Sequence, residues 1–118
     1  MKRVTPRFTT EEKANKHEML SPILDSVYDE IKELSKKKQD DTLNRLKVKM
    51  INRILEQVKE VLAEEPTVQF LDLLDDETLP TNSDAVLILA QFQTAMTQFE
   101  TKYYRYDSVN MEHKWYTK

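Results

Sequence analysis

The stretch DAVLILAQFQTAMTQF, residues 84–99, decides how this chain folds. After Asp84 it runs fifteen residues without a charged side chain, although 33% of the whole chain is charged. Apolar residues recur along it at alternating spacings of four and three, the repeat that marks one face of an α-helix. The row consists of Ala85, Leu89, Phe92, Met96, Phe99, Tyr103 and Tyr106. We therefore predict a helix over about residues 84–106, with its start at Asn82 or Ser83.

The opposite side of this predicted helix is polar but uncharged. It carries Gln91, Thr94, Gln98 and Thr101. An exposed surface helix normally carries Lys and Glu on that side, so we expect this helix to be covered over most of its circumference. A membrane is not what covers it, because a spanning helix needs about 20 apolar residues. We therefore expect no membrane contact. The chain has no cysteine, which fits a reducing compartment, and we expect a cytoplasmic protein.

Similar apolar rows predict three helices upstream. Thr9 and Glu12 have capping-box spacing, which places a helix start near Thr10. Ser21-Pro22 is a second start signal, so we predict helices over about residues 10–20 and 22–38, either separate or as one kinked helix. Another helix over residues 42–64 has an apolar face so wide that it should contact two neighbours. That face is formed by Leu43, Leu46, Val48, Met50, Ile51, Ile54, Leu55, Val58, Val61 and Leu62.

The remaining segments connect or follow these helices. We predict a short helical turn over about residues 68–74 and an irregular tail over residues 107–118. The chain has no glycine, which argues against tight hairpins and phosphate-binding loops. Rows with a 3.5-residue repeat imply shallow helix crossings. The predicted fold is all-α: a single domain, residues 1–118, built as a left-handed three- to four-helix bundle with short connectors.

Charge is unevenly distributed along the chain. Residues 1–59 carry 14 basic and 10 acidic side chains, whereas residues 60–101 carry nine acidic and no basic ones. This segregation either guides the association of opposite faces or neutralises itself within the fold.

Catalytic chemistry finds little support in the sequence. Asp25 with Asp29, and Glu56 with Glu60 and Glu64, lie four residues apart on helix faces, but the glutamate pattern of the all-helical Mg²⁺-dependent pyrophosphohydrolases is absent. Without cysteine, and with histidine only at His17 and His113, a zinc site is close to excluded. We expect no enzyme activity, no metal and no cofactor, with a Mg²⁺-dependent hydrolase as the weakest alternative.

Association with proteins is the function that the sequence favours. The uncharged side of helix 84–106 requires cover, and the interface candidates are Leu87, Gln91, Thr94, Gln98 and Thr101. A second copy could supply that cover by isologous packing of helix 84–106 or helix 42–64, giving a homodimeric adaptor or regulator. The alternative is a monomer in which the N-terminal helix and the tail supply it.

Nucleic-acid binding is the second hypothesis. Arg45, Lys49 and Arg53 recur every four residues and so share one helix face that could contact phosphates. Lys38 and Arg105 are further candidates, and aromatic residues near Arg105 are suited to base stacking. The sequence pI near 5.4 argues against this hypothesis, because nucleic-acid-binding domains are usually basic.

Overall fold

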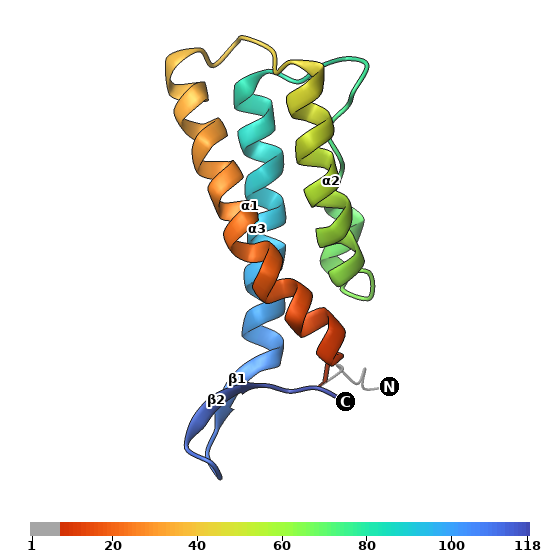
Figure 1. The fold of residues 1–118 in the computed structure, drawn as a ribbon, viewed down its shortest axis with the longest axis vertical. Coiled ribbons are helices and arrows are strands. Elements are labelled where there is room, and N and C mark those ends of the chain that lie inside the picture. Colours follow the sequence, from red (N-terminus) through yellow and green to blue (C-terminus); the bar gives the residue numbers. More distant parts are fainter. Residues whose placement is uncertain (1–7) are drawn as a thin grey trace.

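The computed structural model describes residues 8–118, which form three α-helices, a short 3₁₀ helix and a two-stranded sheet (Figure 1). In chain order these are α1 (Glu11–Lys37), α2 (Arg45–Val61), η1 (Pro66–Phe70), α3 (Asn82–Tyr103), β1 (Tyr104–Asp107) and β2 (Glu112–Trp115). The chain is mostly helical, as predicted. The all-α class is nevertheless incomplete, because the C-terminal segment forms a hairpin.

The two N-terminal segments form one helix. Helix α1 runs through Pro22 without interruption, so of the two alternatives at Ser21-Pro22 the single kinked helix forms, and separate helices over 10–20 and 22–38 do not. Proline removes one backbone hydrogen bond and kinks a helix, and Figure 1 shows α1 bending part-way along its length. Leu20 and Leu24 are both buried, so packing holds the helix on either side of the kink.

Each helix begins at a residue whose side chain caps its first turn. Thr10 accepts a hydrogen bond from the amide of Lys13, Asn44 from that of Lys47, and Thr81 from that of Asp84. Helix α2 is therefore shorter than the predicted 42–64, and α3 ends at Tyr103, before the predicted limit of 106.

The core lies where α1, α2 and α3 face one another. Its fully buried side chains come from the predicted rows and include Val48, Leu55, Val58, Leu89 and Phe92. Tyr103 belongs to this core, whereas Tyr106 is exposed on the hairpin, contrary to the prediction. Among residues 8–118, no helix combines the length and the apolar character needed to cross a bilayer.

The long connection between α2 and α3 begins with η1, slightly before the predicted turn at 68–74, and then runs extended. Leu71 and Leu74 anchor it in the core. Asn52 of α2 fixes it further: its side-chain amide donates to the Leu74 carbonyl at 2.8 Å, and its oxygen accepts from the Leu74 amide at 2.9 Å.

The tail is ordered as an antiparallel hairpin in which Tyr104 pairs with Trp115 and Asp107 with Glu112. The turn needs no glycine, because Met111 takes the left-handed conformation with φ of 57°. Asp107 stabilises the turn by accepting hydrogen bonds from Val109 and Asn110. The absence of glycine argues against tight hairpins, and the hairpin that forms has a longer turn, over residues 108–111.

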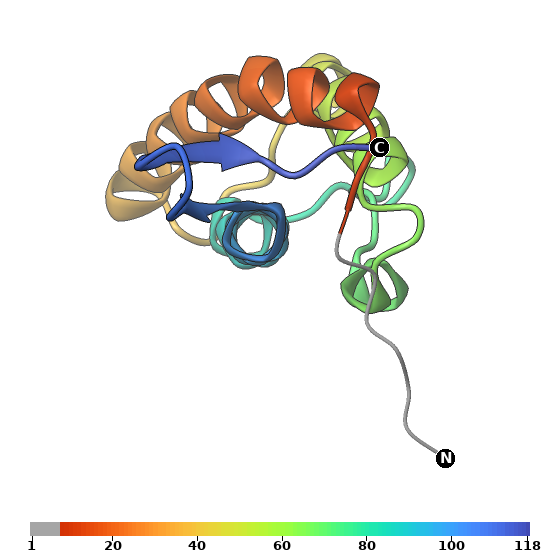
Figure 2. The ribbon, with the colours of Figure 1, turned by 90° about the horizontal axis from the view of Figure 1, so that it is seen from below.

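The hairpin docks on the lower part of the helices. Figure 2 shows β2 lying alongside α1 and β1 continuing from α3. The Trp115 indole donates to Glu18 at 2.6 Å and packs against His17 and Phe99, with ring centroids 5.1 and 6.0 Å away. His17 is buried, and its Nε2 donates a hydrogen bond to the Met96 carbonyl at 2.8 Å.

Candidate protein interfaces

The uncharged side of α3 is open to solvent in the single chain. The five interface candidates on it, Leu87, Gln91, Thr94, Gln98 and Thr101, are all exposed. Helix α1 covers the opposite side of α3, and the hairpin packs near its C-terminal end. The expectation that this helix is covered over most of its circumference is therefore wrong for the single chain, and the alternative in which the N-terminal helix and the tail cover its uncharged side does not hold either.

Part of this side forms a hollow against η1. The hollow has a volume of about 280 Å³ and is lined by Phe70 and Thr67 of η1 together with Leu87, Gln91 and Thr94 of α3. Phe70 is 69% exposed and Leu87 is 62% exposed. The hollow is thus a small apolar surface within an uncharged surround.

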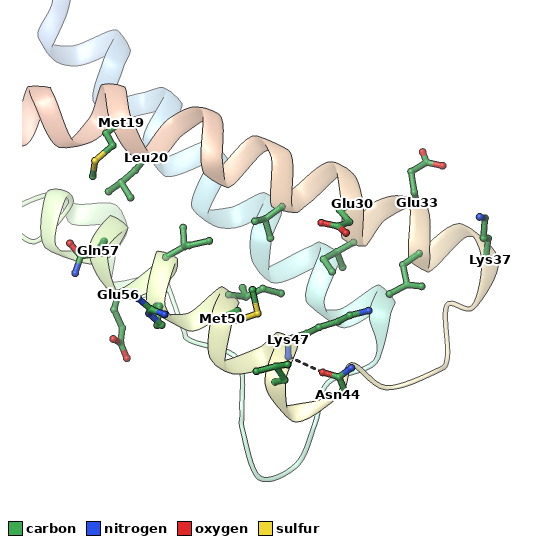
Figure 3. Close-up of a pocket in the computed structure, with 17 residues that line it drawn as sticks. Met19, Leu20, Glu30, Glu33, Lys37, Asn44, Lys47, Met50, Glu56 and Gln57 are labelled. Atoms are coloured by element: carbon green, nitrogen blue, oxygen red, sulfur yellow. Dashed lines mark hydrogen bonds between the residues drawn. The ribbon is translucent and has the colours of Figure 1, made fainter.

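A larger groove runs between α1 and α2, on the side of both helices that faces away from α3. Its volume is about 1100 Å³. Met19, Leu20, Val27 and Leu34 of α1 and Leu46, Met50, Ile51 and Ile54 of α2 form its apolar walls. Figure 3 shows Met19 pointing toward α2 and Met50 pointing toward α1, so the two walls face each other.

The groove walls expose large apolar side chains. Leu46 is 67% and Met50 is 56% exposed, although both belong to the wide apolar face that the sequence predicts on this helix. The predicted contact of this face with two neighbours is confirmed, since α2 packs against both α1 and α3. Leu46 and Met50 lie at the edge of the face that these contacts leave exposed. The sequence did not predict the groove because its shape depends on how α1 and α2 diverge.

Ion pairs join the helices at one end of the groove. Lys16 of α1 pairs with Glu60 of α2 at 3.3 Å, and Lys13 pairs with Glu64 at 3.8 Å. These carboxylates are two of those considered for Mg²⁺. Because they are paired with lysines on the facing helix, they belong to the α1–α2 contact.

Charged side chains line the other end of the groove. Glu30 and Glu33 lie on the α1 wall, and Lys47 lies on the α2 wall at the same level (Figure 3). Lys36 donates a hydrogen bond to Glu33 at 3.0 Å and so holds the pKa of that carboxyl below its usual range. Among the ion pairs of residues 8–118, none engages Glu30, Lys47 or Arg53.

The structure divides the nucleic-acid candidates between the two ends of the molecule. Arg45, Lys49 and Arg53 are exposed on α2, and Lys38, the residue that follows α1, is exposed as well. Arg105 lies at the other end, on the hairpin, with its guanidinium 3.9 Å from the centre of the Tyr116 ring. Arg45 also donates to the Asp76 carbonyl at 3.2 Å. The candidates therefore do not form one basic surface.

The described residues contain no cluster of three His, Asp or Glu side chains that could hold a metal ion. Asp25, which the sequence pairs with Asp29, accepts a hydrogen bond from Gln93 of α3 at 2.8 Å and so belongs to the α1–α3 contact.

Comparison of the chain with models of protein families, with curated proteins and with solved structures found no significant match.

Proposed function

We propose that this chain is a non-enzymatic protein–protein interaction module, a small cytoplasmic helical bundle that associates with itself through helix faces and acts as an adaptor or regulator. The observation that carries the proposal is the groove between α1 and α2, where Leu46 and Met50 lie exposed on successive turns of α2.

Exposed apolar surface of this kind is characteristic of interaction sites. Single apolar residues on a surface need no explanation, but contiguous ones arranged in a groove mark sites for proteins or other ligands. Helical grooves with methionine walls suit helical partners, because the flexible thioether side chains adapt to the side chains that enter. Met19 and Met50 give the groove this character.

Sedimentation velocity at micromolar to tens of micromolar concentration tests the proposal. We expect the wild-type chain to sediment at twice its 14.0 kDa mass. Met50→Asp places a charge in the groove wall and should produce monomers that keep the helical circular dichroism spectrum. Lys49→Asp, one position earlier and outside the groove, is the matched control and should leave the dimer intact. A wild-type chain that sediments as a monomer at these concentrations would contradict self-association.

The uncharged side of α3 is a second surface for the same function. Leu87, beside Phe70, is its most exposed apolar residue. Leu87→Asp separates the two surfaces in the same experiment. If Leu87→Asp abolishes the dimer and Met50→Asp leaves it intact, the interface is formed by α3.

Nucleic-acid binding is the alternative function, supported by the exposure of Lys49 and Arg53 on one face of α2. It predicts binding of DNA or RNA at low salt that weakens steeply as the salt concentration rises. Absence of binding at low salt would exclude it.

A further inference from the structure

We infer that the groove between α1 and α2 is filled by the same groove of a second copy, related by a two-fold axis that runs along the groove. Helix α1 of each copy then lies against α2 of the other, and the four helices enclose one layer of apolar side chains between the two copies. This inference rests on the proposed self-association and adds to it the contact surface, the occupant and the orientation.

The apolar face on α2 is wider than the part that the chain's own core buries. Val48, Leu55 and Val58 on one side of the helix are fully buried in the chain's own core. Leu46 and Met50 extend the same face outward and are more than half exposed, at 67% and 56%. A second helix laid along the groove would bury them, and a two-fold arrangement buries both copies' residues with one contact.

The two groove walls carry opposite charges at one level along the groove. Glu30 and Glu33 lie on the α1 wall, and Lys47 lies on the α2 wall at the same level along the groove (Figure 3). A two-fold axis along the groove exchanges the walls but keeps the level. It therefore brings Glu30 of one copy to Lys47 of the other, and the reverse pair forms by symmetry.

The charge pattern also selects against the other face-to-face orientation. A two-fold axis perpendicular to the helices would pack α2 antiparallel against α2 of the second copy. Centred on Met50, that contact would set Lys47 opposite Arg53, three residues to either side of the centre. Like charges placed opposite each other at an interface disfavour that partner geometry, whereas opposite charges set its register.

The side chains of Glu30 and Lys47 are available for these contacts between the two copies. Among residues 8–118, no ion pair engages Glu30 or Lys47. Figure 3 shows Lys47 extending toward α1 across the open end of the groove. Glu33 is paired with Lys36 within its own helix, so Glu30 is the acidic residue on which the inference depends.

Charge exchange between the walls tests the inference by sedimentation equilibrium. Lys47→Glu and Glu30→Lys should each raise the dimer dissociation constant about tenfold or more, because each sets like charges opposite each other at two symmetric contacts. The double variant Glu30→Lys/Lys47→Glu restores opposite charges and should dimerise within a few-fold of wild type. Lys49→Glu, with the same charge change outside the groove, is the control and should have little effect.

The outcomes separate the inference from the proposed function. A monomeric wild type would overturn both. A wild-type dimer that responds equally to Lys47→Glu and Lys49→Glu, or whose double variant is not restored, would overturn the inference alone. A tighter dimer for Lys47→Glu would indicate α2 against α2 and overturn the two-fold axis along the groove. Melting curves for each variant show that dissociation does not arise from unfolding.

Discussion

Asn52 ties the long acidic connection to α2 at Leu74, as Arg45 does at Asp76. It forms hydrogen bonds with both the amide and the carbonyl of Leu74, as a neighbouring strand would. Asn52→Ala removes both partners from backbone groups that lie partly buried. We expect a loss of about 1–3 kcal/mol in the free energy of unfolding, measured by urea denaturation. Lys49→Ala, exposed on the same helix and outside the groove, should cost much less; an equal cost would contradict the role of Asn52.

His17 is a buried residue whose burial the sequence indicates only in part. It lies three residues before Leu20 and three after Ala14, so its spacing places it in the buried row of α1. In the structure it is covered by Phe99 and Trp115, which lie far away along the chain. The spacing contains the signal for burial, but the residues that make burial favourable come from elements whose placement the sequence does not show.

The hairpin depends on one carboxylate. The Lys114 ammonium, 3.1 Å from Asp107, and the donors of Asn110 and Val109 hold the pKa of Asp107 below its ordinary value, against the raising effect of burial. A carboxyl with a lowered pKa in the folded state stabilises it above the ordinary value of about 4, and this contribution is lost as the pH falls through the lowered pKa. We therefore expect the hairpin amide signals in NMR spectra to change below about pH 4, while those of α2 and α3 persist longer.

Asp107→Asn provides the comparison for this titration. It keeps a side-chain acceptor for the turn amides but cannot ionise, so the acid-dependent change at Val109 and Asn110 should disappear. Persistence of the same change in Asp107→Asn would assign it to another group.

The longer the apolar repeat of a helix or strand, the better the sequence predicts that element. The rows through Leu55 and Phe92 extend over several turns, and they correctly predict α2, α3 and their buried residues. Pro22 left two alternatives open because the same residue begins some helices and kinks others, and packing of Leu20 and Leu24 selects the kinked helix here. The hairpin has strands of four residues and a turn built on Asp107 and Met111, too short for a period to show.

At the scale of the whole molecule, the uncharged side of α3 was visible in the sequence and the groove was not. Absence of charge is a property of one helix, and the exposed positions of Gln91 and Thr94 follow from the phase of its apolar row. The groove results from the angle at which two helices diverge. The sequence nevertheless indicated part of the groove, since Leu46 and Met50 widen the apolar face of α2 beyond the part that the core covers.

The three helices share one core, so a single charge at its centre should unfold the whole chain. Phe92 is fully buried in α3, where α1 and α2 converge. Phe92→Asp loses about 3–5 kcal/mol of packing and adds the cost of burying a carboxylate, against a typical total stability of 5–15 kcal/mol. We expect no cooperative thermal transition by circular dichroism for Phe92→Asp, and the same for Leu55→Asp. Thr97→Asp adds the same charge at an exposed site of α3 and should keep a melting temperature near that of wild type. A cooperative melt for Phe92→Asp would mean that its side chain reaches water, and the assignment of the buried face of α3 would then fail.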